Sequence, residues 1–147
     1  MFKHILIAID GSELSGRTAQ AGVELAKSLG AKVTGLFAMA QYPITGYGEM
    51  GAVPLITPEE FLREEKKQAR GILGTLTKAA QDAGVDCETH AVVNDVPYKA
   101  IIETAMQKGC DIIFMASHGR RGLEALVLGS ETNKVLTHSK IPVLVYR

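Results

Sequence analysis

The stretch Ile5-Leu6-Ile7-Ala8-Ile9-Asp10-Gly11-Ser12 decides the fold class. Its first five residues form an unbroken apolar run, which is typical of a parallel strand that is covered on both faces. Turn-forming residues end this run, and residues 14–29 then repeat apolar side chains at helical spacing until Gly30. A buried strand that leads directly into a helix predicts an α/β fold with a parallel sheet.

The alternation of strand and helix continues along the rest of the chain. Further strands are expected at residues 33–38, 85–93, 112–116 and 141–146, and further helices at residues 57–84, 97–109 and up to about Ser139. The clearest helix start is at Thr57-Pro58-Glu59-Glu60, where Thr57 and Glu60 form a capping box around a first-turn proline. Because no linker or repeat interrupts the pattern, residues 1–147 are expected to form one domain.

The polarity of the strands predicts their order in the sheet. Residues 5–9 and 112–116 are the most apolar and belong in the centre, whereas residues 85–93 alternate polar and apolar side chains and belong at an edge. The expected order is 3-2-1-4-5, an open, mostly parallel five-stranded sheet with helices on both faces, as in Rossmann-like nucleotide-binding folds. Ligands bind such sheets where the strand order reverses, here after strands 1 and 4. The residues at that point are Asp10-Gly11-Ser12 and Ser117-His118-Gly119.

Composition and charge exclude several functions. The 16 basic and 16 acidic residues balance, which argues against a nucleic-acid binder that relies on excess basic charge and favours self-association. No apolar run approaches the about 20 residues of a membrane span, and no signal-peptide pattern follows the first strand. Cys87 and Cys110 do not form a Cys-x-x-Cys pair, so neither a disulfide framework nor a zinc site is indicated. We therefore expect no membrane segment, no metal site and a cytoplasmic location.

Two motifs resemble functional signatures without their structural context. Residues 46–51 match G-x-G-x-x-G, but Pro43 and Pro54 flank them and no helix begins before Thr57, so a flexible loop is the better interpretation. Residues 115–119 resemble half of a hydrolase nucleophile elbow, without its leading glycine. The side chains of Ser117 and His118 are expected to point apart in an extended stretch, and we therefore expect no nucleophile–base pair and no hydrolase.

A stronger signal is an anion site after the fourth strand. Gly119 is followed by Arg120 and Arg121, and Gly129-Ser130 stands at the head of the next helix. Glycines let backbone N–H groups approach an anion, and the N–H groups at a helix start favour negative charge. Asp10 offers an acceptor for ribose hydroxyls across the strand reversal. This pattern predicts a nucleotide site, and tight-turn glycines with a capping serine are an equally strong alternative at this point.

The chain also resembles the universal stress protein family over its whole length. The resemblance rests on residues 4–12, 117–122, 128–130 and 141–145, taken in order. It implies the sheet order given above, a homodimer, a stress-linked role and, for one branch, ATP binding through G-x-x-G-x9-G-[ST]. Ala116 departs from this motif by standing at its first glycine.

The resemblance also implies a set of site residues. Gly119 matches the second glycine of the motif, and Gly129 and Ser130 match its final pair. Asp10 matches the acidic residue that holds the ribose, and Ala38 stands where the backbone of relatives meets adenine. Glu131 puts a carboxylate in the first turn of the helix, where it would repel a triphosphate if it faced inward. The candidate nucleotide-binding residues are Asp10, Ala38, Met115, Ala116, Gly119, Arg120, Gly129, Ser130 and Glu131.

The favoured function is an adenine-nucleotide-binding regulatory module with little or no turnover. ATP with Mg²⁺ is the expected ligand, and AMP and ADP are alternatives. The rival hypothesis is a dimeric interaction protein of the same fold whose nucleotide site is lost, as Ala116 and Glu131 would indicate. A dimer is expected through the edge formed by Val143, Leu144 and Val145. The long connection at residues 40–56 is expected to be either a lid over the site or a disordered loop.

Overall fold

The computed structural model describes residues 1–43, 56–119 and 128–147. Within them strands and helices alternate as predicted. Their bounds are β1 (His4–Ala8), α1 (Glu13–Leu29), β2 (Lys32–Met39), α2 (Pro58–Ala83), β3 (Cys87–Val93), α3 (Pro97–Lys108), β4 (Ile112–Ala116), α4 (Ser130–His138) and β5 (Val143–Tyr146).

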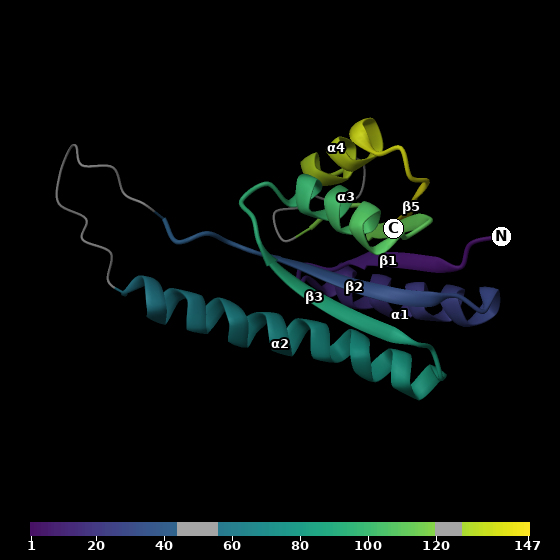
Figure 1. Ribbon diagram of the computed structural model, residues 1–147, viewed down its shortest axis with the longest axis horizontal. Coiled ribbons are helices and arrows are strands. Elements are labelled where there is room, and N and C mark those ends of the chain that lie inside the picture. Colours follow the sequence, from purple (N-terminus) through teal and green to yellow (C-terminus); the bar gives the residue numbers. More distant parts are fainter. Residues whose placement is uncertain (44–55, 120–127) are drawn as a thin grey trace.

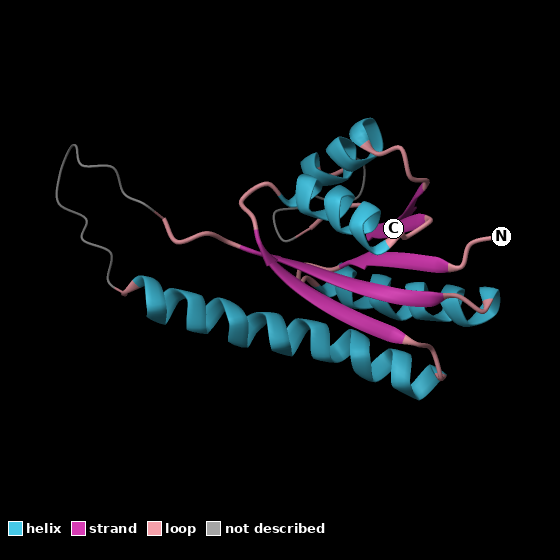
Figure 2. Ribbon diagram, in the orientation of Figure 1, coloured by secondary structure: helices cyan, strands magenta, loops and turns pink. Residues whose placement is uncertain are grey.

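The strands form one parallel sheet in the order β3-β2-β1-β4-β5, which confirms the predicted order (Figure 2). The central position of β1 is visible in its register, because Ile7 pairs with Gly35 on one side and with Phe114 on the other. Every residue of β4 is buried, whereas every residue of β3 is half-buried or exposed. The apolar and alternating patterns therefore separate central strands from an edge strand, as expected.

Helices cover both faces of the sheet, with α1 and α2 on one face and α3 and α4 on the other (Figure 1). The alternation of side chains along β1 divides the core accordingly. Ile5 and Ile7 belong to the core under α1 and α2, and Leu6 belongs to the core under α3 and α4. The sheet is thus buried on both faces around the point where the strand order reverses.

The helix boundaries follow local capping chemistry. The backbone N–H of Glu60 donates to Thr57 Oγ1 (3.2 Å), and Glu60 Oε2 accepts from the Thr57 N–H (2.9 Å), so the predicted capping box is present. The first three helices each end at a glycine in the left-handed region. No helix in the described parts of the chain is both long and apolar enough to cross a membrane.

Two strands begin later than the sequence predicts. β3 begins at Cys87 rather than Val85, because the Val85 N–H donates to the Ala80 carbonyl (2.9 Å) and thereby closes the end of α2. β5 begins at Val143 rather than Ile141, because Ser139 Oγ bonds to both the N–H (3.0 Å) and the carbonyl (2.8 Å) of Ile141. In both cases a backbone group that the sequence pattern predicts to pair with a neighbouring strand forms a local hydrogen bond instead.

Candidate functional site

The turn after β1 holds Asp10 at the strand reversal. Gly11 has φ 81°, a left-handed conformation that favours glycine. Asp10 Oδ1 accepts from the Ser12 N–H (3.0 Å), and Ser15 Oγ accepts from the N–H groups of Asp10 (3.0 Å) and Gly11 (3.3 Å). Ser15 is buried and orders this turn, a role that the sequence motifs did not indicate. Ser12 is the residue that caps α1.

At the end of β4, Ala116 occupies an ordinary strand position. It is the last residue of β4 and pairs with Tyr146 of β5. The Ser117 N–H continues this pairing by donating to the Tyr146 carbonyl (2.7 Å). Alanine adopts extended backbone without strain. Ala116, where the chain departs from the family motif, therefore ends a strand and needs no left-handed conformation.

The prediction that Ser117 and His118 point apart is wrong. Both residues lie in a bend after β4, and the Ser117 hydroxyl lies 3.2 Å from His118 Nδ1, within hydrogen-bond distance. The prediction assumed an extended backbone at both residues, whereas the extended strand ends at Ala116. Ser117 is only 4% exposed, and His118 has no second hydrogen-bond partner among the described residues. Among the residues that the structure describes, the pair therefore lacks both access to a substrate and the third group that orients a catalytic histidine.

The structure brings Asp10 and Gly119 together. A β-carbon at Gly119 would overlap Oδ2 of Asp10, so only glycine fits at this position without displacing the carboxylate. A β-carbon at Gly129 would lie 3.1 Å from His118 Cα and 3.4 Å from the Ser117 carbonyl oxygen. The Gly129 N–H donates to that same carbonyl (2.8 Å). The residues after β1, the residues after β4 and the start of α4 therefore meet at one place.

The start of α4 has backbone N–H groups directed outward from the helix end. Gly129 is its N-cap residue and makes no side-chain cap hydrogen bond. The first residues of a helix have no acceptor within the helix, and the helix dipole favours an anion there. Thr132 Oγ1 donates to the Ala116 carbonyl (3.0 Å) and ties this first turn to the end of β4. Thr132 is a positioning residue that the sequence motifs did not reveal.

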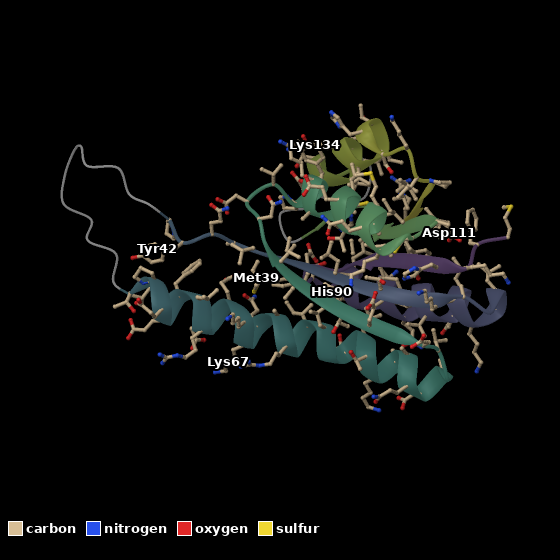
Figure 3. All side chains as sticks on the ribbon, viewed as in Figure 1. Met39, Tyr42, Lys67, His90, Asp111 and Lys134 are labelled. Atoms are coloured by element: carbon tan, nitrogen blue, oxygen red, sulfur yellow. The ribbon has the colours of Figure 1, made fainter. Side chains whose placement is uncertain are left out.

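The Glu131 carboxylate faces the start of α3. Its Oε2 accepts from the Tyr98 N–H (2.8 Å), and its Oε1 lies 2.9 Å from Lys134 Nζ. The N-cap residue of α3, Val96, makes no side-chain cap hydrogen bond of its own. Glu131 of α4 therefore provides the hydrogen-bond acceptor that the start of α3 lacks. Lys134, which is labelled in Figure 3, compensates the negative charge of Glu131.

The remaining candidates are backbone neighbours or lie outside the described residues. Ala38 pairs with Val92 near the end of β2, and Met115 is buried in β4, where it pairs with Ala8 and Val145. Arg120 and Arg121 lie outside the described residues, and so do the G-x-G-x-x-G stretch and most of the proposed lid, which fall within residues 44–55.

Next to that undescribed stretch, the two ends of the long connection contact each other. The Tyr42 hydroxyl donates to the Ile56 carbonyl (2.9 Å), and the Tyr42 ring packs edge-on against Phe61 of α2 with 5.6 Å between ring centroids. These contacts place Tyr42 beside the start of α2 (Figure 3).

Comparison with known proteins agrees with this geometry. The sequence model of the universal stress protein family matches residues 1–147. Universal stress protein MJ0531 of Methanocaldococcus jannaschii is 33% identical over 147 residues, which cover 100% of this chain and 83% of the relative. Universal stress protein YxiE of Bacillus subtilis is 35% identical over 151 residues, which cover 100% of both chains.

Solved structures share the fold. A universal stress protein family member from Burkholderia pseudomallei matches with a TM-score of 0.78 and 20% identity, over 99% of this chain and 96% of that one. A universal stress protein in complex with cAMP matches with a TM-score of 0.73 and 23% identity, over 99% and 97%. The Archaeoglobus fulgidus protein in complex with dAMP matches with a TM-score of 0.70 and 17% identity, over 100% and 98%. Since the family model and both sequence relatives span this chain from end to end, the protein belongs to the universal stress protein family.

Proposed function

We propose that this universal stress protein binds an adenine nucleotide, with ATP as the preferred ligand, where the turns after β1 and β4 meet the start of α4. The observation that carries the proposal is the contact geometry between Asp10 and Gly119, which leaves room for backbone but no side chain beside the carboxylate. The relatives solved with cAMP and dAMP support it, because they carry adenine nucleotides on the same fold.

Each part of the site has a proposed role. The Asp10 carboxylate accepts hydrogen bonds from ribose hydroxyls, and its backbone is held by Ser15. The phosphates bind at Gly119 and at the N–H groups that begin α4, where Ser130 adds a hydroxyl donor. The Glu131 carboxylate bonds to the Tyr98 N–H instead, so its charge is engaged at α3.

Four further features of the proposal carry over from the family pattern. The backbone at Ala38 meets the adenine, and Met115 and Ala116 line the end of β4. Arg120 adds positive charge near the phosphates, and Mg²⁺ accompanies ATP.

We further propose that the site binds and senses the nucleotide with little or no turnover. Hydrolysis needs a base that activates water within hydrogen-bond reach of the phosphate. In the closest candidate pair, the Ser117 hydroxyl and His118 Nδ1 lie within hydrogen-bond distance of each other, and Ser117 is buried. An ATPase rate that falls when Ser117 is replaced by alanine would contradict this part of the proposal.

The test is direct detection of the ligand. Purified protein is denatured, and the released small molecules are identified by mass spectrometry; thermal shift is then titrated with ATP, ADP, AMP and GTP. We expect a released adenine nucleotide and a shift that Asp10→Ala abolishes. Glu13→Ala is the matched control, because Glu13 is an exposed acid in the first turn of the neighbouring helix α1. No released nucleotide and no shift at millimolar ATP with Mg²⁺ would favour the dimeric interaction protein instead.

We also propose a homodimer through β5. This four-residue edge strand pairs only with β4 among the described strands, and its Leu144 side chain is 37% exposed. The N–H groups of Ile113 and Ser117 donate to the carbonyls of Pro142 and Tyr146, so the even-numbered residues of this segment bond to β4. Because successive residues of a strand alternate in direction, the N–H and C=O groups of Val145 face away from β4. Val145→Pro should therefore block pairing with a second copy without removing bonds to β4. Sedimentation velocity should show a dimer for the parent chain and a monomer for the variant, and a parent monomer would refute the proposal.

A further inference from the structure

The other edge of the sheet, at β3, presents a long row of backbone groups without a partner strand. β3 spans seven residues and pairs with β2 on one side only, and no described strand lies on its other side (Figure 2). Proteins usually block such an edge with proline, lysine, a bulge or a very short strand. β3 contains neither proline nor lysine, its one acidic side chain, Glu88, forms an ion pair with Lys108 of α3 (3.6 Å), and its register with β2 runs without a bulge from Cys87 to Val93.

Two hydrogen bonds show which backbone groups face outward. The Val33 N–H donates to the Asp86 carbonyl (2.8 Å), and the Asn94 N–H donates to the Met39 carbonyl (3.0 Å). In a parallel pair, residues alternate between bonding to the neighbour and facing away from it. Even-numbered residues of β3 therefore bond to β2, and the odd-numbered residues direct their N–H and C=O groups to the free edge. These residues are Cys87, Thr89, Ala91 and Val93.

Two of these residues also line a groove between β3 and α2. The groove has a volume of about 410 Å³ and lies where α2 runs alongside β3 (Figure 1). Thr89 and Ala91 line the groove on the side of β3. On the side of α2 the groove is open at Gly74, because nothing lies within 4 Å of the position that a β-carbon of this residue would take. A strand added at the free edge would thus direct every second side chain toward this groove.

The groove is positively charged and has no internal counterion. Lys66 and Arg70 line it from α2, four residues apart on one helix face, and no carboxylate lines it. Neither side chain forms an ion pair with any residue that the structure describes. Lys67, by contrast, lies on the side of α2 away from the sheet (Figure 3).

The spacing of these two cations matches the repeat of a strand. Side chains on one face of a strand recur at about 6.6–6.8 Å, and four helical residues span about 6 Å. Two acidic side chains at alternate positions of an added strand would therefore face Lys66 and Arg70 at once. An added strand would gain main-chain hydrogen bonds from the free edge and specificity from the cations.

We propose that β3 and the groove beside it bind an extended, acidic peptide segment of a partner protein, which joins the sheet as a sixth strand. The segment carries carboxylates at alternate positions that face α2. This site is separate from the proposed nucleotide site, since no residue that lines the groove belongs to that site. The proposal therefore does not depend on whether nucleotide binds.

The test uses fluorescence anisotropy with the full chain and a labelled nine-residue peptide in which Glu alternates with Val. The controls are the same peptide with Lys in place of Glu, and the acidic peptide N-methylated at every backbone amide, which cannot donate hydrogen bonds to β3. We expect binding of the acidic peptide alone, and a loss of about two- to fivefold for Lys66→Ala and for Arg70→Ala, because both side chains are exposed. Lys67→Ala is the matched control and should bind like the parent chain.

Ala91→Pro tests strand addition itself. It removes one outward-facing N–H while leaving the bonds to β2 intact, so the fold and the response to ATP should be unchanged while peptide binding is lost. No peptide binding at millimolar concentration, equal binding of the N-methylated peptide, or parent-like binding by Ala91→Pro would overturn the proposal. If Ala91→Pro instead converts a dimer into a monomer in sedimentation velocity, the occupant of this edge is a second copy and the proposal fails.

Discussion

The carboxylate of Asp10 lies directly against Gly119, so that a methyl group at position 119 would overlap Oδ2 of the carboxylate. Asp10 follows β1 and Gly119 follows β4, and the two strands are parallel neighbours in the sheet. Parallel pairing brings the carboxyl ends of both strands to the same edge. The Asp10 carboxylate therefore favours glycine at position 119, whether or not a ligand also contacts this position.

Gly119→Ala should weaken ATP binding by about tenfold or more if the proposed site is correct, because the new methyl group displaces the Asp10 carboxylate that we propose holds the ribose. Thermal stability should change little, since Gly119 is exposed. Isothermal titration calorimetry with ATP and Mg²⁺ measures the change. Gly71→Ala is the matched control: this exposed helical glycine has nothing within 4 Å of a β-carbon, and the substitution should raise stability by about 1 kcal/mol. Parent affinity in Gly119→Ala would show that Asp10 does not contact the ligand.

Glu131→Ala should cost about 1–2 kcal/mol of unfolding free energy, because it leaves the start of α3 without its acceptor at the Tyr98 N–H. Lys134→Ala should cost less, within about 0.5 kcal/mol, because its ion pair with Glu131 is solvent-exposed. Urea denaturation of both variants compares the two costs. Equal costs would show that Glu131 acts mainly through the ion pair rather than as a cap.

Gly35 and Leu76 should show energetic coupling in the core. A β-carbon at Gly35 would overlap Leu76 Cδ2, and Leu76 is fully buried. Gly35→Ala should cost about 1–3 kcal/mol through overpacking, and Leu76→Ala about 2–5 kcal/mol through cavity formation. The double variant should lose less than the sum by about 0.5 kcal/mol or more, because the new methyl group fills part of the cavity. Strict additivity in a double-mutant cycle would contradict this packing.

Stability should fall as the pH drops through about 6.5, because the unfolded chain protonates His4 more readily than the folded chain does. His4 is 5% exposed and its Nε2 lies 2.7 Å from Thr34 Oγ1. Burial and the nearby Lys32 charge lower the pKa of His4, and Glu88 and Asp111 oppose this only partly. The loss should level off once the pH is below the folded-state pKa.

Urea denaturation at pH 7.5, 6.5 and 5.5 measures this dependence, and His4→Gln should flatten it. The Thr34 hydroxyl donates to Glu88 Oε1 (3.1 Å) and lowers the pKa of Glu88, so that carboxylate contributes stability that is lost only at more acidic pH. The chosen range therefore separates the contribution of His4 from that of Glu88. An unchanged slope in His4→Gln would assign the effect to another group.

Both cysteine thiols should react slowly with Ellman's reagent at pH 7.5 in the folded protein. Burial raises the pKa of Cys87 and of Cys110 to about 11, which leaves very little of the reactive thiolate. In guanidinium chloride both thiols should react at the rate of a free thiol. Rapid stoichiometric labelling of the folded chain would show that one of them is exposed and activated.

The sequence by itself determined the architecture, because it depends on patterns that are local in the chain. The unbroken apolar run at residues 5–9 and the alternation at residues 85–93 separated central strands from an edge strand, and Thr57 and Gly84 bounded α2 as predicted. The motif residues Asp10, Gly119 and Gly129 were likewise found from their spacing. Strand ends were less predictable, because Val85 and Ile141 use their backbone groups in local hydrogen bonds.

Only the tertiary structure decided which side chains these residues face. The Glu131 carboxylate caps α3 across a helix interface, the Ser117 and His118 side chains meet in a bend, and Gly119 makes room for Asp10. It likewise placed Lys66 and Arg70 of α2 beside the free edge of β3. The physical reason is that side-chain direction depends on packing between elements distant in the chain, whereas helices and strands follow from residues that are neighbours along it.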